Sequence, residues 1–147
     1  MLGSIRPATT ADRPGLHALA LDAEAVFAPD GDVLLVAEDD SGAPAGWLAG
    51  TFDGAYPGPD APVRPPHGYV QAVVADPAAR RAGVGRALLE AFTATAREHG
   101  LEWVFAVPGE APGVAGRVAW LAESGFTPVV DPGELWPVMG RWTEPGR

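Results

Sequence analysis

The sequence predicts a single α/β domain, residues 1–147, in which a mixed β-sheet carries helices on both faces. The length of 147 residues is that of one ordinary domain. Apolar residues make up 47% and charged residues 20% of the chain, as in globular proteins. Short apolar runs of strand character alternate with three segments of helical character, in the order β-α-β-β-β-α-β-α-β-β.

Seven segments predict strands, and most of them are short apolar runs bounded by glycine, proline or aspartate. They are residues 4–7, 33–37, 45–52, 68–75, 103–107, 126–130 and 134–141. Turn-forming residues from Asp39 to Pro44 join the second and third as an antiparallel hairpin. The fourth is almost continuously apolar, which is typical of a central strand. Pro137 interrupts the last one and predicts an edge strand or a bulge.

Three segments predict helices. The first follows two capping threonines and stops at the Pro-Asp-Gly sequence of residues 29–31. The second, Val84 to His99, carries an apolar stripe of period 3.6 and precedes Gly100, a residue that favours helix C-termini. The third runs from Val114 to Glu123. Residues 53–66, rich in glycine and proline, predict a long loop of the kind that often borders a site.

Composition excludes several classes of function. The formal net charge is −9 and no basic cluster occurs, so a nucleic-acid partner is not expected. The chain has no cysteine, which excludes disulfides, thiolate nucleophiles and cysteine-ligated metals, and no metal site is expected. All ten basic residues are arginine, which excludes a Schiff-base lysine and a P-loop. Without a leader-like or membrane-spanning segment, we expect a cytoplasmic protein with no membrane partner.

The stretch from Ala75 to Glu90 carries the clearest chemical signal, because it reads as a strand end, a glycine-bearing turn and a helix start. A helix N-terminus exposes unpaired N–H groups and about half a positive charge, which suits an anion. Gly83 and Gly85 allow the backbone to approach phosphate oxygens closely. Three arginines add fork-shaped donors around the same turn: Arg80, Arg81 and Arg86.

Other interpretations of this turn fit less well. A dinucleotide fingerprint requires a third glycine where Leu88 stands, and it follows the first strand of the fold rather than a late one. A P-loop requires a lysine. Glycines that merely end a turn do not explain why three arginines bracket a helix start. An anion-binding turn is therefore the better interpretation.

The sequence Arg80-x-x-Gly83-x-Gly85 resembles the R/Q-x-x-G-x-G/A motif of the GNAT superfamily of N-acetyltransferases. The flanking sequences V-V-A-D-P and R-A-L-L-E also resemble the family's strand end and helix start. Residues 119–126 resemble its late helix ending in Gly-Phe, and Val138-Met139 its final strand. The similarity covers nearly the whole chain and implies the GNAT fold, a mostly antiparallel central sheet of six to seven strands.

The resemblance implies an acetyltransferase that uses acetyl-CoA as co-substrate and acetylates an amine. In the family, the backbone at the end of the central strand pairs with the pantetheine arm, and the turn binds the pyrophosphate. The matching positions are Val73, Val74 and Ala75 for the arm, and Arg80, Arg81, Ala82, Gly83, Val84, Gly85 and Arg86 for the pyrophosphate. Dimers are common in the family, so the resemblance also allows a homodimer.

The acid–base residues depart from the family pattern. Tyr69 stands where the family often has a carboxylate base, and Leu121 stands where it usually has a proton-donating tyrosine. The candidates for catalysis are therefore Tyr69, His67 and Glu110, with Asp53 as a further acidic candidate. We expect His67, at the end of a loop, to be solvated. With no cysteine or lysine for a covalent relay, the acceptor amine is expected to attack the thioester directly.

These departures leave alternative functions open. The first is an N-acetyltransferase acting on a small molecule or on a peptide or protein N-terminus. Deprotonating an α-amino group near pH 7.4 costs under about 1 kcal/mol, against roughly 4 kcal/mol for a lysine-like amine. An α-amino acceptor therefore suits a site without a strong base. The second is a catalytically weak acyl-CoA-binding regulatory module. The third is a structural protein with a decayed loop.

Overall fold

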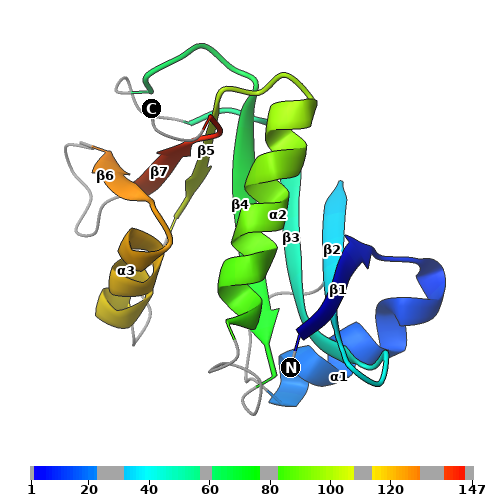
Figure 1. Cartoon of the computed structure of the whole chain (residues 1–147). Helices are drawn as coiled ribbons and strands as arrows, with labels where there is room; N and C mark the ends of the chain where they lie inside the picture. The colour runs from blue at the N-terminus through cyan, green and yellow to red at the C-terminus, as the bar shows by residue number, and fades with distance from the viewer. Residues whose placement is uncertain are drawn as a thin grey trace. The chain divides into compact units, whose positions relative to one another are not determined.

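A computed structural model describes residues 2–22, 32–56, 61–76, 83–107, 114–129 and 138–144 (Figure 1). Its elements are β1 (Leu2–Pro7), the 3₁₀ helix η1 (Thr10–Asp12), α1 (Arg13–Asp22), β2 (Val33–Asp39), β3 (Pro44–Gly54), β4 (His67–Ala75), α2 (Val84–Glu98), β5 (Trp103–Ala106), α3 (Val114–Glu123), β6 (Thr127–Val129) and β7 (Val138–Trp142). The predicted order of strands and helices is confirmed. The predicted end of the first helix, residues 29–31, lies outside the described residues.

The seven strands follow the hydrogen-bonded order β1-β2-β3-β4-β5-β7-β6. The pairs β1–β2, β2–β3, β5–β7 and β6–β7 are antiparallel, whereas β4 and β5 are parallel. A mostly antiparallel sheet of six to seven strands is therefore confirmed. Of the edge position and the bulge that Pro137 predicted as alternatives, the edge position is wrong, because β7 pairs with β5 on one side and β6 on the other, and the bulge stays a prediction. Pro137 itself lies outside the described residues.

Contacts group the chain into two compact units. Unit 1 comprises Met1–Thr51 and Gln71–Phe92, and unit 2 comprises Phe52–Val70 and Thr93–Arg147. The elements β3, β4 and α2 contribute residues to both units. A single domain over residues 1–147 stays a prediction.

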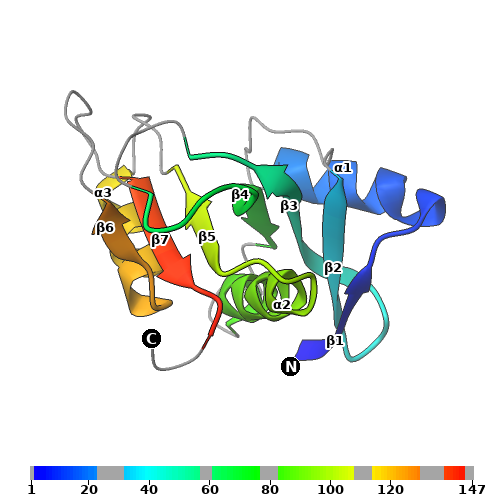
Figure 2. The same cartoon turned by 90° about the horizontal axis from the view of Figure 1, so that it is seen from above.

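In unit 1, α1 and α2 cover opposite faces of the strands (Figure 2). Leu16 and Leu19 of α1 pack into a buried cluster with Val36, Trp47, Ala49, Ala72 and Val74. The Trp47 indole N–H donates to the Leu16 carbonyl oxygen at 3.1 Å, which ties α1 to β3. Gly46 faces the other side of β3 and lies against Val84 at the start of α2. Helices on both faces, as predicted, are thus found within this unit.

The predicted hairpin joins β2 and β3 in unit 1. Asp39 closes the turn, because its Oδ1 accepts hydrogen bonds from the Ser41 hydroxyl at 2.6 Å, the Ser41 N–H at 2.8 Å and the Ala43 N–H at 3.1 Å. These donors favour the carboxylate and lower the pKa of Asp39. Of the residues that predicted the hairpin, the Asp39 side chain thus accepts hydrogen bonds from two others and stabilises the turn.

Unit 2 is built around aromatic side chains. Tyr56, Trp103, Phe105 and Val138 form its buried cluster. The rings of Trp103 and Phe105 are stacked with centroids 5.7 Å apart, and Tyr56 meets both edge-on. Such stacked and edge-to-face pairs contribute beyond the area they bury. Unit 2 therefore has an aromatic core, unlike the mainly aliphatic core around α1.

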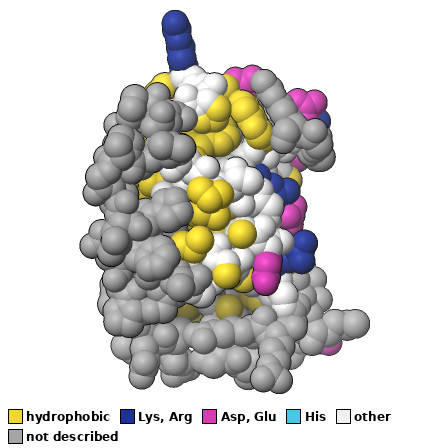
Figure 3. Space-filling view, turned by 90° about the vertical axis from the view of Figure 1, so that its left-hand side faces the viewer, with side chains coloured by type: hydrophobic (Ala, Val, Ile, Leu, Met, Phe, Trp, Pro, Cys, Tyr) yellow, Lys and Arg dark blue, Asp and Glu magenta, His cyan; other side chains and the backbone are white. Residues whose placement is uncertain are grey.

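The side of the molecule that carries β6 and α3 shows hydrophobic side chains, with acidic and basic side chains along one edge of the view (Figure 3). Ala119, Ala122 and Pro128 are exposed on these two elements. β6 is an edge strand of the sheet, and Pro128 removes one backbone donor from it. Among the described helices, none combines the length and the apolar character that crossing a membrane requires.

Candidate active site

The start of α2 has the geometry of an anion-binding helix N-terminus. Gly83 precedes the helix with φ +77° and is exposed, and apart from its chain neighbours no described residue has an atom within 4 Å of the place where a Cβ would stand. The Ala87 N–H donates to the Gly83 carbonyl oxygen at 2.9 Å and so begins the helical hydrogen bonding. The N–H groups of Val84, Gly85 and Arg86 therefore have no partner within the helix. They are the donors that a bound anion could use.

Charge at this helix start is also favourable for an anion. The first turn of α2 contains no acidic residue. Arg86 is exposed and Gly85 is half-buried, whereas the Val84 side chain is completely buried and anchors the turn. The positive end of the helix dipole is thus not neutralised by a carboxylate of the first turn. The residues present fit a diphosphate.

The end of β4 offers backbone groups beyond its pairing with β5. Gly68 to Val70 face Val104 to Ala106, and β5 ends at Ala106, whereas β4 continues to Ala75. Val74 is buried and faces the α1 cluster, while Val73 and Ala75 are half-buried. This strand end and the start of α2 both belong to unit 1.

The structure does not describe every predicted site residue. Arg80, Arg81, Ala82 and Glu110 lie outside the described residues. Gly83 to Arg86 and Val73 to Ala75 are described, and they lie on either side of the segment that connects β4 with α2 in the sequence. The described part of the predicted cofactor set is therefore confined to these two backbone segments.

The prediction that His67 is solvated is wrong, because its side chain is completely buried. Its Nδ1 accepts a hydrogen bond from the Tyr56 N–H at 3.0 Å, so Nε2 carries the proton and donates to the Val63 carbonyl oxygen at 2.8 Å. The ring also meets Trp103 edge-on with centroids 5.2 Å apart. Both ring nitrogens are thus hydrogen-bonded to backbone groups of Tyr56 and Val63, which leaves neither free to take a substrate proton.

Tyr69 is half-buried and stacks on Phe105, with ring centroids 4.8 Å apart and planes 10° apart. The stacking fixes the ring plane, and the side chain is still partly accessible. Leu121, at the position of the usual proton donor, is buried. Of the predicted acid–base candidates among the described residues, Tyr69 and the exposed Asp53 therefore keep accessible side chains.

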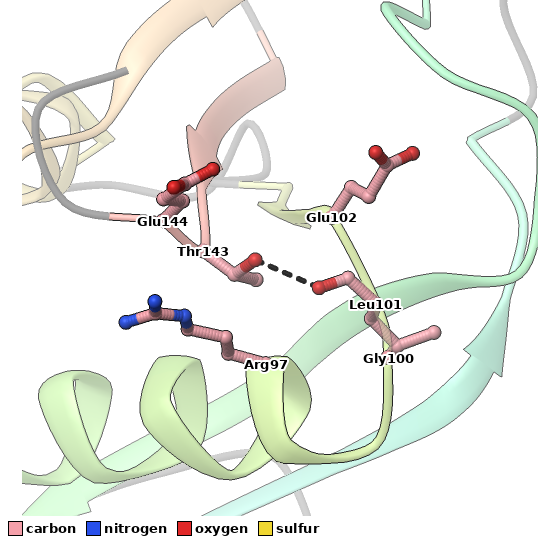
Figure 4. A pocket seen from close by; sticks show the side chains of 6 residues that line it. All are labelled: Arg97, Gly100, Leu101, Glu102, Thr143 and Glu144. Atoms are coloured by element: carbon pink, nitrogen blue, oxygen red, sulfur yellow. Dashed lines mark hydrogen bonds between the residues drawn. The ribbon is translucent and has the colours of Figure 1, made fainter.

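The pocket found in the described part of unit 2 lies at the other end of α2 (Figure 4). It is a hollow of about 260 Å³ lined by Arg97, Gly100, Leu101, Glu102, Thr143 and Glu144. Among these residues the Thr143 hydroxyl donates to the Leu101 carbonyl oxygen at 2.7 Å. None of the predicted site residues lines it.

Comparison with known proteins identifies the family and the fold. A family model described as "Acetyltransferase (GNAT) family" matches residues 5–115. No curated protein is similar enough to the chain to count as a match.

Several solved structures share the fold. Nourseothricin acetyltransferase is 21% identical, with a TM-score of 0.69 over 96% of this chain and 98% of that one. The ribosomal-protein-S18-alanine N-acetyltransferase from Escherichia coli is 18% identical, with a TM-score of 0.69 over 97% and 94%. N-acetylglutamate synthase from Neisseria gonorrhoeae, complexed with coenzyme A and L-arginine, is 20% identical, with a TM-score of 0.66 over 95% of this chain and 32% of that one. At these identities the likeness shows a common fold.

Proposed function

Because the chain belongs to the GNAT acetyltransferase family, we propose that this N-acetyltransferase moves the acetyl group of acetyl-CoA to a primary amine of a small molecule or of a peptide or protein N-terminus. The observation that carries the proposal is the start of α2, where an exposed glycine, three N–H groups without a helical partner and no first-turn acid suit a diphosphate.

The proposed coenzyme site uses backbone at both ends of one turn. The amides of Val84, Gly85 and Arg86 would hold the diphosphate, together with the neighbouring positions Arg80, Arg81, Ala82 and Gly83. The backbone of Val73, Val74 and Ala75 would pair with the pantetheine arm. Acetyl-CoA supplies an activated thioester. Support comes from the position of these two segments in the same compact unit.

In the proposed reaction the amine nitrogen attacks the thioester carbonyl carbon directly. The N–C bond forms, the C–S bond breaks, the coenzyme leaves as a thiolate, and the amine gives up one proton. Backbone N–H groups near Val73 to Ala75 would stabilise the oxyanion. Tyr69 and Glu110 are the proposed proton-transfer candidates, since the chain has neither a cysteine nor a lysine for a covalent relay.

The proposed acceptor is an amine of low pKa. An α-amino group, with a pKa of about 7.8, is partly deprotonated at neutral pH, whereas a lysine-like amine at about 10.4 is not. The related structures carry the names of chemically different acceptors, which agrees with an acceptor set by each protein's own side chains.

One observation favours a second candidate, a catalytically weak acyl-CoA-binding regulatory module. Leu121 is buried where the family's proton-donating tyrosine would stand, and leucine cannot protonate a thiolate. Such a module would bind acetyl-CoA and release no thiol.

Two measurements test the proposal. A ligand at about 100 times its Kd adds about 2.7 kcal/mol to stability, which for a chain of this size raises the melting temperature by roughly 5–10 °C. We expect this rise with acetyl-CoA, and thiol release when an α-amine is added. A rise in melting temperature with no thiol released from acetyl-CoA, whichever amine is added, would favour the regulatory module. No rise at all would contradict the coenzyme site.

The remaining parts of the proposal concern the protein in the cell. We propose a cytoplasmic, single-domain enzyme with no nucleic-acid or membrane partner, which forms a homodimer as is common in its family. Light scattering on the purified chain measures its mass, and a monomer mass of 15.2 kDa would contradict the dimer.

A further inference from the structure

We infer that Gly46 is a positioning residue for the coenzyme site, because its missing side chain lets the end of β4 and the start of α2 lie close together. The inference rests on the proposed function, since those two segments are the proposed binding sites for the pantetheine arm and the diphosphate. Gly46 itself would touch no part of the coenzyme. Its effect would come through the spacing of the two segments.

The contacts around Gly46 leave no room for a side chain. A Cβ at this position would lie 2.7 Å from Val84 Cγ1, 2.9 Å from the Val74 carbonyl oxygen and 3.4 Å from Ala75 Cα. The first two distances are shorter than Cβ contacts in real structures. Val84 is completely buried, so its side chain cannot turn into solvent, and the second contact is with backbone. An alanine would therefore force β4 or α2 to move.

The neighbouring residue holds the same strand end. The Asp76 N–H donates to the Ala45 carbonyl oxygen at 2.8 Å, immediately after β4 ends at Ala75. The pair Ala45–Gly46 of β3 thus contacts the last residues before the turn and the first helical residue after it. β3 acts as the common support that fixes the distance between the two ends of the turn.

This distance matters because one ligand would have to reach both segments. The Val74 carbonyl group belongs to the proposed arm-binding backbone, and the Val84 amide belongs to the proposed diphosphate site. A displacement of a few tenths of an ångström or more would prevent hydrogen bonds at both segments from having good geometry at the same time. The coenzyme would then bind less tightly even where the fold is intact.

The test is calorimetric titration of coenzyme A into four forms of the full chain: wild type, Gly46→Ala, Val84→Ala and the double variant Gly46→Ala/Val84→Ala. We expect Gly46→Ala to weaken binding about tenfold, which corresponds to the loss of one or two good hydrogen bonds. The double variant should regain part of the affinity, because it removes the 2.7 Å contact and leaves the 2.9 Å contact with the Val74 carbonyl group. In turnover, the KM for acetyl-CoA should rise while kcat changes little.

The matched control is Val36→Ala, which also truncates the core of unit 1 but on the face that α1 covers. It should lower the melting temperature without weakening coenzyme A. Equal affinity of Gly46→Ala and wild type would overturn the inference, as would an equal loss of affinity in Val36→Ala. If Gly46→Ala does not fold, the double variant must bind more weakly than Val84→Ala alone, and equal affinities would refute the role. No binding by the wild type would instead count against the proposed function.

Discussion

Two described helix starts in unit 1, those of η1 and α2, differ in whether a nearby side chain accepts from their backbone N–H groups. At η1, which leads into α1, the chain supplies its own carboxylate: Asp12 Oδ2 accepts from the Thr9 N–H at 2.7 Å and from the Thr9 hydroxyl at 3.1 Å. Arg6 holds this carboxylate with two bonds of 2.8 Å and also binds Glu38. At α2 the first turn has no acid at all.

The difference distinguishes a structural helix start from one suited to a ligand. A carboxylate at the N-terminus satisfies donors and interacts favourably with the dipole, so it leaves little for an outside anion. Without one, the same donors are available to a phosphate. The C-terminal end of α2 resembles the start of η1, because the chain itself supplies the hydrogen-bond partners there. Gly100 and Leu101 donate their N–H groups to the carbonyl oxygens of Arg97 and Ala96 at 3.0 Å.

The largest expected effect comes from giving the start of α2 its own carboxylate. Gly85→Glu should abolish the rise in melting temperature caused by acetyl-CoA, because the new charge occupies the donors and repels the diphosphate. Thermal unfolding with and without acetyl-CoA measures this. Ala94→Glu adds the same charge at an exposed position of the same helix and should keep the full rise. Retention of the rise in Gly85→Glu would place the coenzyme elsewhere.

A smaller effect should separate the two ends of α2. Gly83 and Gly100 both have positive φ, +77° and +84°, and in the part of the chain that the structure describes no atom beyond their chain neighbours lies within 4 Å of where a Cβ would stand. Alanine at either position should cost about 1 kcal/mol in backbone strain and lower the melting temperature by about 2–4 °C. Gly83→Ala alone should also weaken coenzyme A, about threefold to tenfold, because the turn must shift toward an allowed φ. Equal affinities of the two variants would show that the exposed glycine is only a helix cap.

The smallest effect concerns the start of η1 and how the stability that Asp12 contributes there depends on pH. The Arg6 guanidinium, followed by the Thr9 N–H, lowers the pKa of Asp12 below its usual range. The stabilisation by this carboxylate is therefore present above about pH 4, the usual pKa, and is lost as the pH falls toward the lowered value. Asp12→Asn should lower the melting temperature slightly at pH 7 and flatten its decline between about pH 4 and 2.

Urea or thermal unfolding across this pH range measures the effect. It should be small because water screens the pair through the Arg6 side chain, which is 35% exposed, although the Asp12 side chain is only 11% exposed. Coenzyme A affinity of Asp12→Asn should equal that of the wild type. A loss of affinity in this variant would mean that the two helix starts are not independent.

Local sequence determined the elements and the start of α2, where the coenzyme site is proposed. The position of α2 follows from the apolar periodicity of its sequence, and its two ends follow from the backbone freedom of Gly83 and Gly100. Both causes act within a few residues. The hairpin between β2 and β3 likewise follows from Asp39 and its neighbours. These features were predictable because their physical causes lie close together in the chain.

Tertiary structure alone decided which side chains are enclosed and which strands are neighbours. His67 follows a proline-rich sequence, yet it is buried. Backbone groups of Tyr56 and Val63 bind its two nitrogens, and the rings of Trp103 and Phe105 pack against it. β7 lies between β5 and β6, and Gly46 meets Val84, which is 38 positions later in the sequence (84 − 46). Burial and close approach depend on partners that are remote in sequence, and no local pattern encodes those partners.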